Sequence, residues 1–194
     1  FRQQIRLNCP VHKVERTLEG VVIHSADGRE HFDKVIFACH SDQALALLED
    51  PSLAEQQILG AMTYADNDVA LHTDTRLLPD RPLAWASWNY RLDASTHKPA
   101  AVTYAMNILQ GIDSATTFCV SLNQTAIINP LKILARYTYA HPQYSLAAVA
   151  AQARWEELHG ARHTYYCGAY WASGFHEDGV VSALRVAQAF GETL

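Results

Sequence analysis

The stretch GAYWASGFHEDGVVSALRVAQAFG, residues 168–191, sets the fold expected at the end of this chain. Its second half has apolar residues at helical spacing, which predicts an amphipathic helix. Asp178 is the predicted N-cap of that helix, and Gly179 leaves its first turn open to a ligand. The loop from Gly168 to Gly174 joins two glycines through aromatic residues, so the backbone there can approach a flat or anionic group. The pattern favours a ligand lying against the helix start.

The first 40 residues predict a small sheet. Apolar and polar residues alternate, with breaks at Gly20 and at Asp27-Gly28 that suit tight turns, which indicates an antiparallel meander. The apolar run KVIFAC (residues 34–39) follows. It is typical of a strand covered on both faces.

The middle of the chain predicts a different layer. Ser52 and Glu55 have the spacing of a capping box, so short helices are expected there. Four strand-like stretches between residues 68 and 123 predict one antiparallel sheet. A helix that starts near residue 145 is expected to stop at Gly160, with a turn at His141-Pro142 before it. The predicted fold class is therefore α+β.

Composition excludes several classes of protein. The 194 residues are 49% hydrophobic, and 15 Lys and Arg stand against 20 Asp and Glu, giving a net charge of -5. This balance argues against nucleic acid as a partner, and no apolar run is long enough to span a membrane. The four scattered cysteines form no CxxC pair and are expected to be reduced. We therefore expect a cytoplasmic protein.

A family resemblance indicates which ligand this is. The segment YYCGAYWASGFHEDGVVSALRVA (residues 165–187) resembles the C-terminal flavin-binding motif of the flavin-containing amine oxidase and protoporphyrinogen oxidase superfamily. The subgroup that it is most similar to is the bacterial predicted NAD/FAD-binding oxidoreductases. The similarity continues through CPVHKV (residues 9–14), FDKVIFACHSDQALALL (residues 32–48) and VTYAMNILQG (residues 102–111). The resemblance implies an antiparallel substrate-domain sheet with helices, inserted into the remainder of an FAD-binding α/β domain.

The resemblance also implies which residues touch FAD, through their backbones. Gly168 and Ala169 match the positions beside the pyrophosphate and ribityl chain. Asp178, Gly179 and Val180 match the helix start near the pyrimidine edge of the flavin, where amide N–H groups stabilise negative charge. Val11 matches the residue whose backbone touches the adenine. On this basis residues 1–40 and 160–194 are a partial FAD-binding domain, and residues 41–159 are the substrate-binding domain.

One departure from the family pattern concerns the nucleotide. A complete member carries a G-x-G-x-x-G fingerprint in its first strand and helix, but no two of the nine glycines here are separated by a single residue. The chain is therefore expected to be the C-terminal part of a longer flavoprotein whose N-terminal dinucleotide-binding half is missing. By itself it is expected to bind FAD poorly, to be inactive, and to self-associate through the surface left exposed.

A second departure concerns the chemistry. Many amine oxidases have a lysine near the flavin in the early substrate-domain strands, but ADNDVALHT (residues 65–73) has none. Oxidation, desaturation or isomerisation of a small or apolar substrate by hydride transfer to flavin is therefore favoured, and no catalytic residue can be assigned. The substrate-lining candidates are Trp88, Asn89, Tyr104 and Asn107, because polar side chains among aromatic ones need partners.

Other interpretations remain beside this one. His176, Glu177 and Asp178 are consecutive and point in different directions, so no metal site is expected. His176 or Glu177 lies either at the flavin edge or in loop hydrogen bonds. The alternative function is a non-catalytic module that binds an apolar ligand or a protein on the same scaffold.

Overall fold

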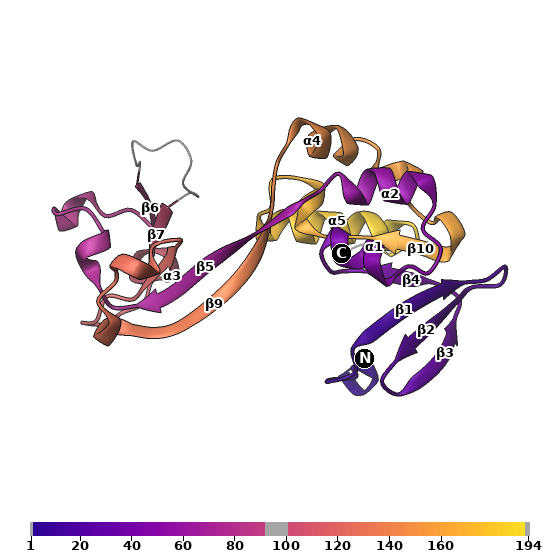
Figure 1. Ribbon diagram of the computed structural model, residues 1–194, viewed down its shortest axis with the longest axis horizontal. Coiled ribbons are helices and arrows are strands. Elements are labelled where there is room, and N and C mark those ends of the chain that lie inside the picture. Colours follow the sequence, from indigo (N-terminus) through magenta and orange to yellow (C-terminus); the bar gives the residue numbers. More distant parts are fainter. Residues whose placement is uncertain (1, 92–100, 193–194) are drawn as a thin grey trace. The chain divides into compact units, whose positions relative to one another are not determined.

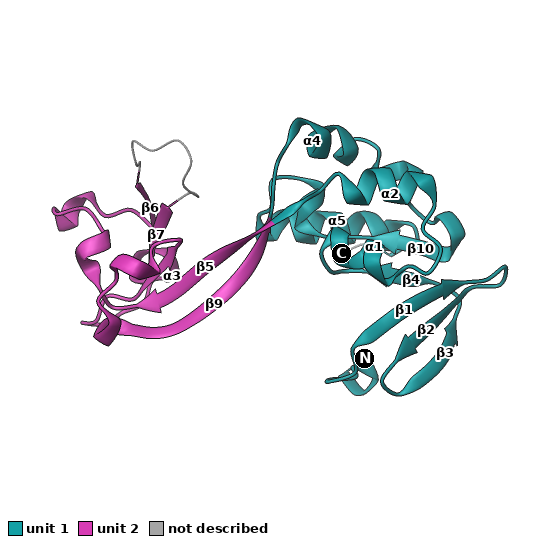
Figure 2. Cartoon of the chain, viewed as in Figure 1, with its two compact units in different colours: residues 1–64, 142–194 teal, residues 65–141 magenta. Residues whose placement is uncertain are grey.

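The computed structural model describes residues 2–91 and 101–192. The chain forms two compact units, one made of residues 1–64 and 142–194 and the other of residues 65–141 (Figures 1 and 2). We call them unit 1 and unit 2 and describe each by itself. The predicted α+β class, with an antiparallel sheet and helices, is confirmed.

Unit 1 begins with the predicted meander. A short 3-10 helix, Arg2–Gln4, precedes the strands β1 (Val11–Arg16), β2 (Val21–Ser25) and β3 (Gly28–Phe32). The three strands are antiparallel in the order β1-β2-β3, as the breaks at the glycines predicted.

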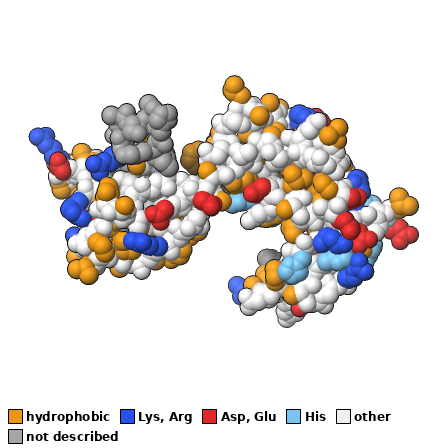
Figure 3. Space-filling view, viewed as in Figure 1, with side chains coloured by type: hydrophobic (Ala, Val, Ile, Leu, Met, Phe, Trp, Pro, Cys, Tyr) orange, Lys and Arg blue, Asp and Glu red, His pale blue; other side chains and the backbone are white. Residues whose placement is uncertain are grey.

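Charged and histidine side chains gather on this small sheet (Figure 3). His24 Nε2 lies 3.2 Å from Glu15 Oε2, and Arg29 Nε donates to His24 Nδ1 at 3.3 Å. These contacts are exposed or partly exposed, so they contribute little to the stability of the sheet.

A parallel pair of strands forms the centre of unit 1. The strands β4 (Val35–Phe37) and β10 (Thr164–Tyr166) run side by side, and Cys167 N–H donates to Phe37 O at 2.9 Å just beyond them. The prediction that residues 34–39 are covered on both faces is wrong for the described residues, because the side chain of Ile36 is 48% exposed.

Helices lie against both faces of this pair, although Ile36 of β4 stays half exposed. The helices α1 (Ser41–Leu47), α2 (Leu53–Gly60) and α4 (Leu146–Gln152) share a core with Phe37 and Tyr166. Helix α5 (His176–Gln188) lies on the opposite face, where Val186 packs with Tyr165 and Cys167.

Two helix ends test the sequence interpretation. The capping box of α2 is confirmed, since Glu55 N–H donates to Ser52 Oγ at 3.2 Å and Ser52 N–H to Glu55 Oε2 at 2.7 Å. The prediction that α4 continues to Gly160 is wrong. The helix ends at Gln152 and the 3-10 turns Trp155–Glu157 and Ala161–His163 follow. The change of direction brings the Trp155 indole N–H to Tyr166 O, at 3.2 Å.

Unit 2 is built on a five-stranded sheet in the order β6-β7-β8-β5-β9. Its strands are β5 (Tyr64–His72), β6 (Trp88–Arg91), β7 (Ala101–Ala105), β8 (Cys119–Leu122) and β9 (Ile133–Pro142). The pairs β6·β7, β7·β8 and β5·β8 are antiparallel, as predicted. Its connections include the 3-10 helices Thr75–Leu77, Pro82–Ala84, Thr125–Ile127 and Pro130–Lys132.

Two local predictions in unit 2 are wrong. The third expected strand ends at Ala105, and α3 (Met106–Gln110) follows it. The expected turn at His141-Pro142 is the end of β9, where the side chain of Asn67 contacts His141 Nδ1 at 3.0 Å.

The compact units differ in extent from the predicted domains. Helices α1, α2 and α4 lie within the segment expected to bind substrate, residues 41–159, but they pack into the core of unit 1. Among the described residues, no helix has the length and apolar character needed to cross a membrane.

Candidate functional site

The glycine turn after β10 is held to α5 by one serine. Gly168 N–H donates to Ser182 Oγ at 2.8 Å, and the same hydroxyl donates to Gly179 O at 2.8 Å. A Cβ on Gly168 would overlap the buried ring of Tyr170, so this position accepts only glycine without a rearrangement. The turn therefore presents bare backbone at a fixed place.

The first turn of α5 packs against this glycine turn. A Cβ placed on Gly179 would lie 3.9 Å from Ala169 Cβ, so the two segments are in near contact. Val180 follows, and its side chain is 47% exposed. The structure thus places Gly179, near the start of α5, beside Ala169 of the glycine turn.

Asp178 has a different role from the predicted one. The N-cap of α5 is Phe175, and Asp178 is the third helical residue. Its Oδ2 accepts from Phe175 N at 2.9 Å and from Ser173 N at 3.1 Å, which fixes the loop before the helix. A capping carboxylate at this position also interacts favourably with the helix dipole. The sequence identified the right residue type but placed the helix start three residues too late.

The start of α5 keeps free donors. Because its N-cap is apolar, no described side chain accepts from the N–H groups of the first turn. The side chains of His176 and Glu177 are exposed and have no hydrogen bond or ion pair with a described residue. These N–H groups can therefore serve an anionic ligand atom.

Val11 lies in a separate groove of about 330 Å³. The groove also includes Ile23 and Phe32 from the meander and Val35 from β4. Strand β4 connects the groove with the glycine turn, because Phe37 O accepts from Cys167, the residue before Gly168.

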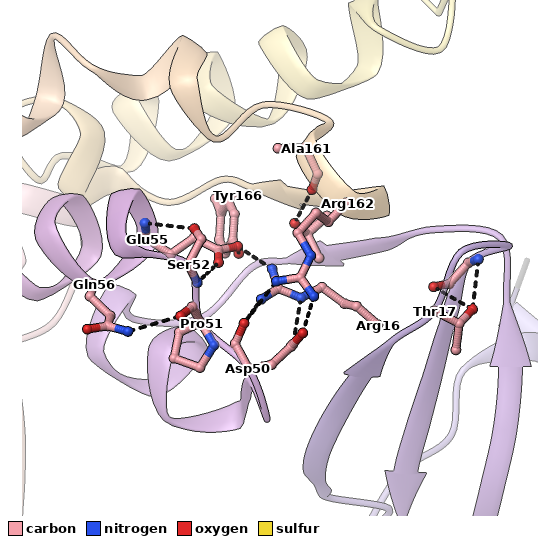
Figure 4. A network of polar contacts seen from close by, with 12 residues as sticks. Arg16, Thr17, Asp50, Pro51, Ser52, Glu55, Gln56, Ala161, Arg162 and Tyr166 are labelled. Atoms are coloured by element: carbon pink, nitrogen blue, oxygen red, sulfur yellow. Dashed lines mark hydrogen bonds and ion pairs between the residues drawn. The ribbon is translucent and has the colours of Figure 1, made fainter.

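A buried ion-pair network anchors the strand that leads to the glycine turn (Figure 4). The guanidinium of Arg16 is paired with Glu55 and, at 3.1 Å, with Asp50. Tyr166 Oη donates to Glu55 Oε1 at 2.6 Å, and Arg162 also pairs with Asp50. Burial alone would raise the pKa of Glu55, but hydrogen bonds from Arg16 and Tyr166 outweigh it and lower that pKa. The network joins three segments that are distant in the sequence, around Arg16, around residues 50–55 and around residues 162–166.

Two of the four substrate-lining candidates share an open sheet face in unit 2. Trp88 and Tyr104 are directly opposite each other on β6 and β7, and Trp88 is 59% exposed. Asn89 points to the other face, because successive side chains of a strand alternate. Its amide bonds Ala86 O at 2.9 Å and Thr103 O at 3.2 Å.

The fourth candidate, Asn107, is a residue of α3 whose side chain holds the segment that follows the helix. Its side chain lies in α3, where Oδ1 accepts from Phe118 N at 2.8 Å and Nδ2 donates to Thr116 O at 2.9 Å. The partners that the two asparagines needed are therefore backbone groups.

The sequence interpretation missed Tyr137 and Tyr139. Both lie on β9 and are about half exposed, with ring centroids 5.6 Å apart. They share a face of β9 with His141. His141 contacts Asn67 on β5, and Leu71 lies on the same face of β5 as Asn67. Alternation in ARYTYAHP was the signal that could have predicted this strand.

Beneath the open face, neutral groups form a buried relay. Asp74 N–H donates to His72 Nδ1 at 3.1 Å, so Nε2 carries the ring proton and donates to Ser121 Oγ at 2.8 Å. Ser121 contacts Thr103 Oγ1 at 2.7 Å, and Gln124 Nε2 donates to the same Thr103 oxygen at 3.1 Å. Burial lowers the pKa of His72, partly opposed by Asp74, so the ring is neutral. The relay holds the sheet that carries the open face.

No described set of three or more His, Cys, Asp or Glu side chains is arranged to hold a metal ion. The four cysteines are all free thiols, and burial raises the pKa of Cys119 to about 11. Cys119 is therefore an inert core residue.

Comparison with known proteins identifies the family. Residues 2–108, more than half of the chain, match the family of flavin containing amine oxidoreductases, and the chain belongs to that family. No curated protein sequence matches the chain.

Solved structures agree on the fold. A putative protoporphyrinogen oxidase from Exiguobacterium sp. 255-15 is 16% identical with a TM-score of 0.68, over 96% of this chain and 47% of its own. A CLA-producing fatty acid isomerase from P. acnes is 14% identical with a TM-score of 0.64, over 94% and 47%. Cyclohexylamine oxidase from Brevibacterium oxydans IH-35A is 14% identical with a TM-score of 0.59, over 99% and 51%. The chain spans about half the length of each.

The residues of unit 1 fit the flavin nucleotide that the family implies. The glycine position that excludes a side chain and the free N–H donors of α5 suit a pyrophosphate and an electron-rich ring edge. The groove at Val11 is lined largely by apolar side chains, which suits a flat base.

Proposed function

We propose that this chain is the C-terminal part of an FAD-dependent oxidoreductase that oxidises, desaturates or isomerises a small or apolar organic substrate. The observation that carries the proposal is the Gly168 turn, which Ser182 ties to the open first turn of α5. Membership of the flavin family supports a flavin cofactor, and the resemblance of residues 165–187 to the FAD-binding motif supports FAD as its form. The unpaired cysteines support a cytoplasmic location.

When bound, FAD supplies the hydride acceptor. The residues of this chain then have three tasks. Gly168 and Ala169 receive the pyrophosphate and ribityl chain along their backbones, and Val11 contacts the adenine. The free N–H groups of the first turn of α5, which include that of Asp178, face the pyrimidine edge, and Gly179 and Val180 continue the helix beside it.

Unit 2 is proposed to bind the substrate. Trp88 and Tyr104 contribute aromatic surface to which an apolar substrate can bind. The neutral relay beneath them brings no charge to this face, which favours an uncharged substrate. A non-catalytic binding module is the alternative, and no observation favours it.

The test is a visible absorption spectrum of the product of the native coding region, purified without added cofactor, beside the 194-residue chain. The proposal expects flavin bands in the former and none in the latter, because the dinucleotide-binding half is needed for tight binding. A native product that stays colourless after FAD is added would contradict it.

A further inference from the structure

Unit 1 has a second cleft, of about 730 Å³, between α5 and the segment that follows α4. This volume lies within the range of small-molecule sites in proteins. One wall is the C-terminal end of α5, where Arg185, Gln188 and Ala189 share a face at helical spacing. The other wall consists of Gln152, Ala153, Trp155, Glu156 and His159.

Hydrogen bonds to the backbone hold the wall that follows α4 in place. The Trp155 indole N–H donates to Tyr166 O at 3.2 Å. Gln152 Nε2 donates to Tyr170 O at 2.8 Å. Because these side chains are already fixed, a ligand that enters the cleft has little ordering entropy to lose on the protein side.

The cleft contains one cation and one anion, and neither forms an ion pair with a described residue. The guanidinium of Arg185 lies over the Trp155 ring, 5.9 Å from its centroid. This contact gives its N–H groups no oxygen acceptor, so they are free to bond a carboxylate. Glu156 is exposed, and the neighbouring charges of Arg154 and Glu157 are paired with each other at 2.7 Å.

The rest of the cleft is uncharged and partly apolar. Burial lowers the pKa of His159, partly opposed by Glu156, so its ring is neutral at pH 7. This ring lies against the Trp155 indole, with centroids 4.0 Å apart. Ala153 and Ala189 have small side chains, which leave room for an apolar group of a ligand beside the indole.

We propose that this cleft binds an aromatic amino acid. Its carboxylate pairs with Arg185, its ammonium group pairs with Glu156, and its ring lies beside Trp155. A plain anion fits worse because Glu156 would repel it, and a plain cation fits worse because Arg185 would repel it. The site goes beyond the proposed function, since it requires no flavin.

Isothermal titration calorimetry of the product of the native coding region tests the ligand class. L-phenylalanine is compared with three probes that each lack one group: 3-phenylpropanoate lacks the ammonium group, L-phenylalaninamide lacks the carboxylate, and L-alanine lacks the ring. L-phenylalanine is expected to bind with a Kd below about 1 mM and at least about tenfold more tightly than each probe. No binding of L-phenylalanine, or equal binding of any probe, would overturn the proposal.

Three variants test the place of binding. Arg185→Gln and Glu156→Gln are each expected to weaken L-phenylalanine binding at least about tenfold. Arg136→Gln removes the same positive charge at an exposed site of β9 outside the cleft, and it is the matched control that should bind as the wild type does. Circular dichroism confirms that each variant folds.

An L-phenylalanine affinity that Arg185→Gln leaves unchanged would place the amino acid elsewhere, such as at the flavin, and would contradict this site. Flavin absorbance of the same samples separates the inference from the proposed function. Binding that depends on Arg185 in a product without flavin bands leaves this site standing and removes the cofactor proposal.

Discussion

The buried polar groups of the two units differ in charge and in how far apart in the sequence their members lie. In unit 1, Arg16, Glu55 and Tyr166 form a network that joins segments from both ends of the chain (Figure 4). In unit 2, His72 and Ser121 belong to a neutral relay within one continuous segment. The buried carboxylate of unit 2, Asp74, is paired with Arg76 in the same turn.

This difference follows from how each unit is assembled. Unit 1 needs contacts between residues 1–64 and 142–194, and ion pairs with several hydrogen bonds give one defined geometry there. The network fixes β10 two residues before Gly168, so the proposed cofactor site depends on it. Unit 2 needs only to hold one sheet in shape, which neutral hydrogen bonds do without the cost of burying charge.

The largest effect is expected from Arg16→Ala. It leaves Glu55 buried and without its cation, so it should destabilise unit 1 by about 3–5 kcal/mol. Ser121→Ala, the comparison in unit 2, breaks neutral hydrogen bonds and should cost about 1–3 kcal/mol. Urea unfolding with hydrogen exchange resolved by unit measures both.

The exposed pair of Lys13 and Glu49 provides the control for charge. Lys13→Ala should cost no more than about 1 kcal/mol. If Arg16→Ala lowered the free energy of unfolding of unit 1 as little as Lys13→Ala does, the network would not be what holds unit 1 together.

As the pH falls from 7, the stability of unit 2 should decrease before that of unit 1. Burial lowers the pKa of His72, so below about pH 6.5 the unfolded chain takes up a proton that the folded unit does not. Stability then falls by up to about 1.4 kcal/mol per pH unit until the folded pKa is reached. The lowered pKa of Glu55 gives unit 1 a contribution that is fully present above about pH 4.5 and is lost as pH falls through the folded pKa. His159 of unit 1 has its pKa lowered by burial too, but it is only partly buried.

Urea midpoints of each unit at pH 7 and pH 5 test this order. His72→Gln, which cannot titrate, should remove most of the loss in unit 2 between these values. A steeper loss in unit 1 than in unit 2 would contradict the assignment of the pH response to His72.

The smallest effect on stability is expected on the open face of unit 2. Trp88→Ala should cost less than about 1 kcal/mol, because the side chain is 59% exposed. In the longer product it should raise the KM for substrates that bleach the flavin. Leu131→Ala, at a site that is 95% exposed, is the control and should leave KM unchanged. Equal KM values for both variants would remove Trp88 from the substrate face.

Much of this arrangement was predictable from local signals. The meander, the capping box of α2 and the helix at residues 176–188 follow from turns, caps and periodicity. The start of that helix was misplaced because Asp178 resembles an N-cap, whereas the actual N-cap, Phe175, has no capping side chain.

The rest depends on contacts between distant residues, which no local pattern carries. No local pattern around Arg16 predicts its ion pair with Glu55, and none around Gly168 predicts its hydrogen bond to Ser182. The end of α4 and the role of Asn107 were likewise decided by tertiary partners, Tyr166 O for Trp155 and Phe118 N for Asn107.

The most direct test of the account is FAD binding by Gly168→Ala in the product of the native coding region. Gly60→Ala is the control, because a Cβ there meets only Leu45 at an ordinary 3.7 Å. With circular dichroism confirming that both variants fold, Gly168→Ala should bind FAD at least about tenfold more weakly, and Gly60→Ala should bind it as the wild type does. Unchanged FAD affinity in Gly168→Ala would contradict the claim that this turn holds the cofactor.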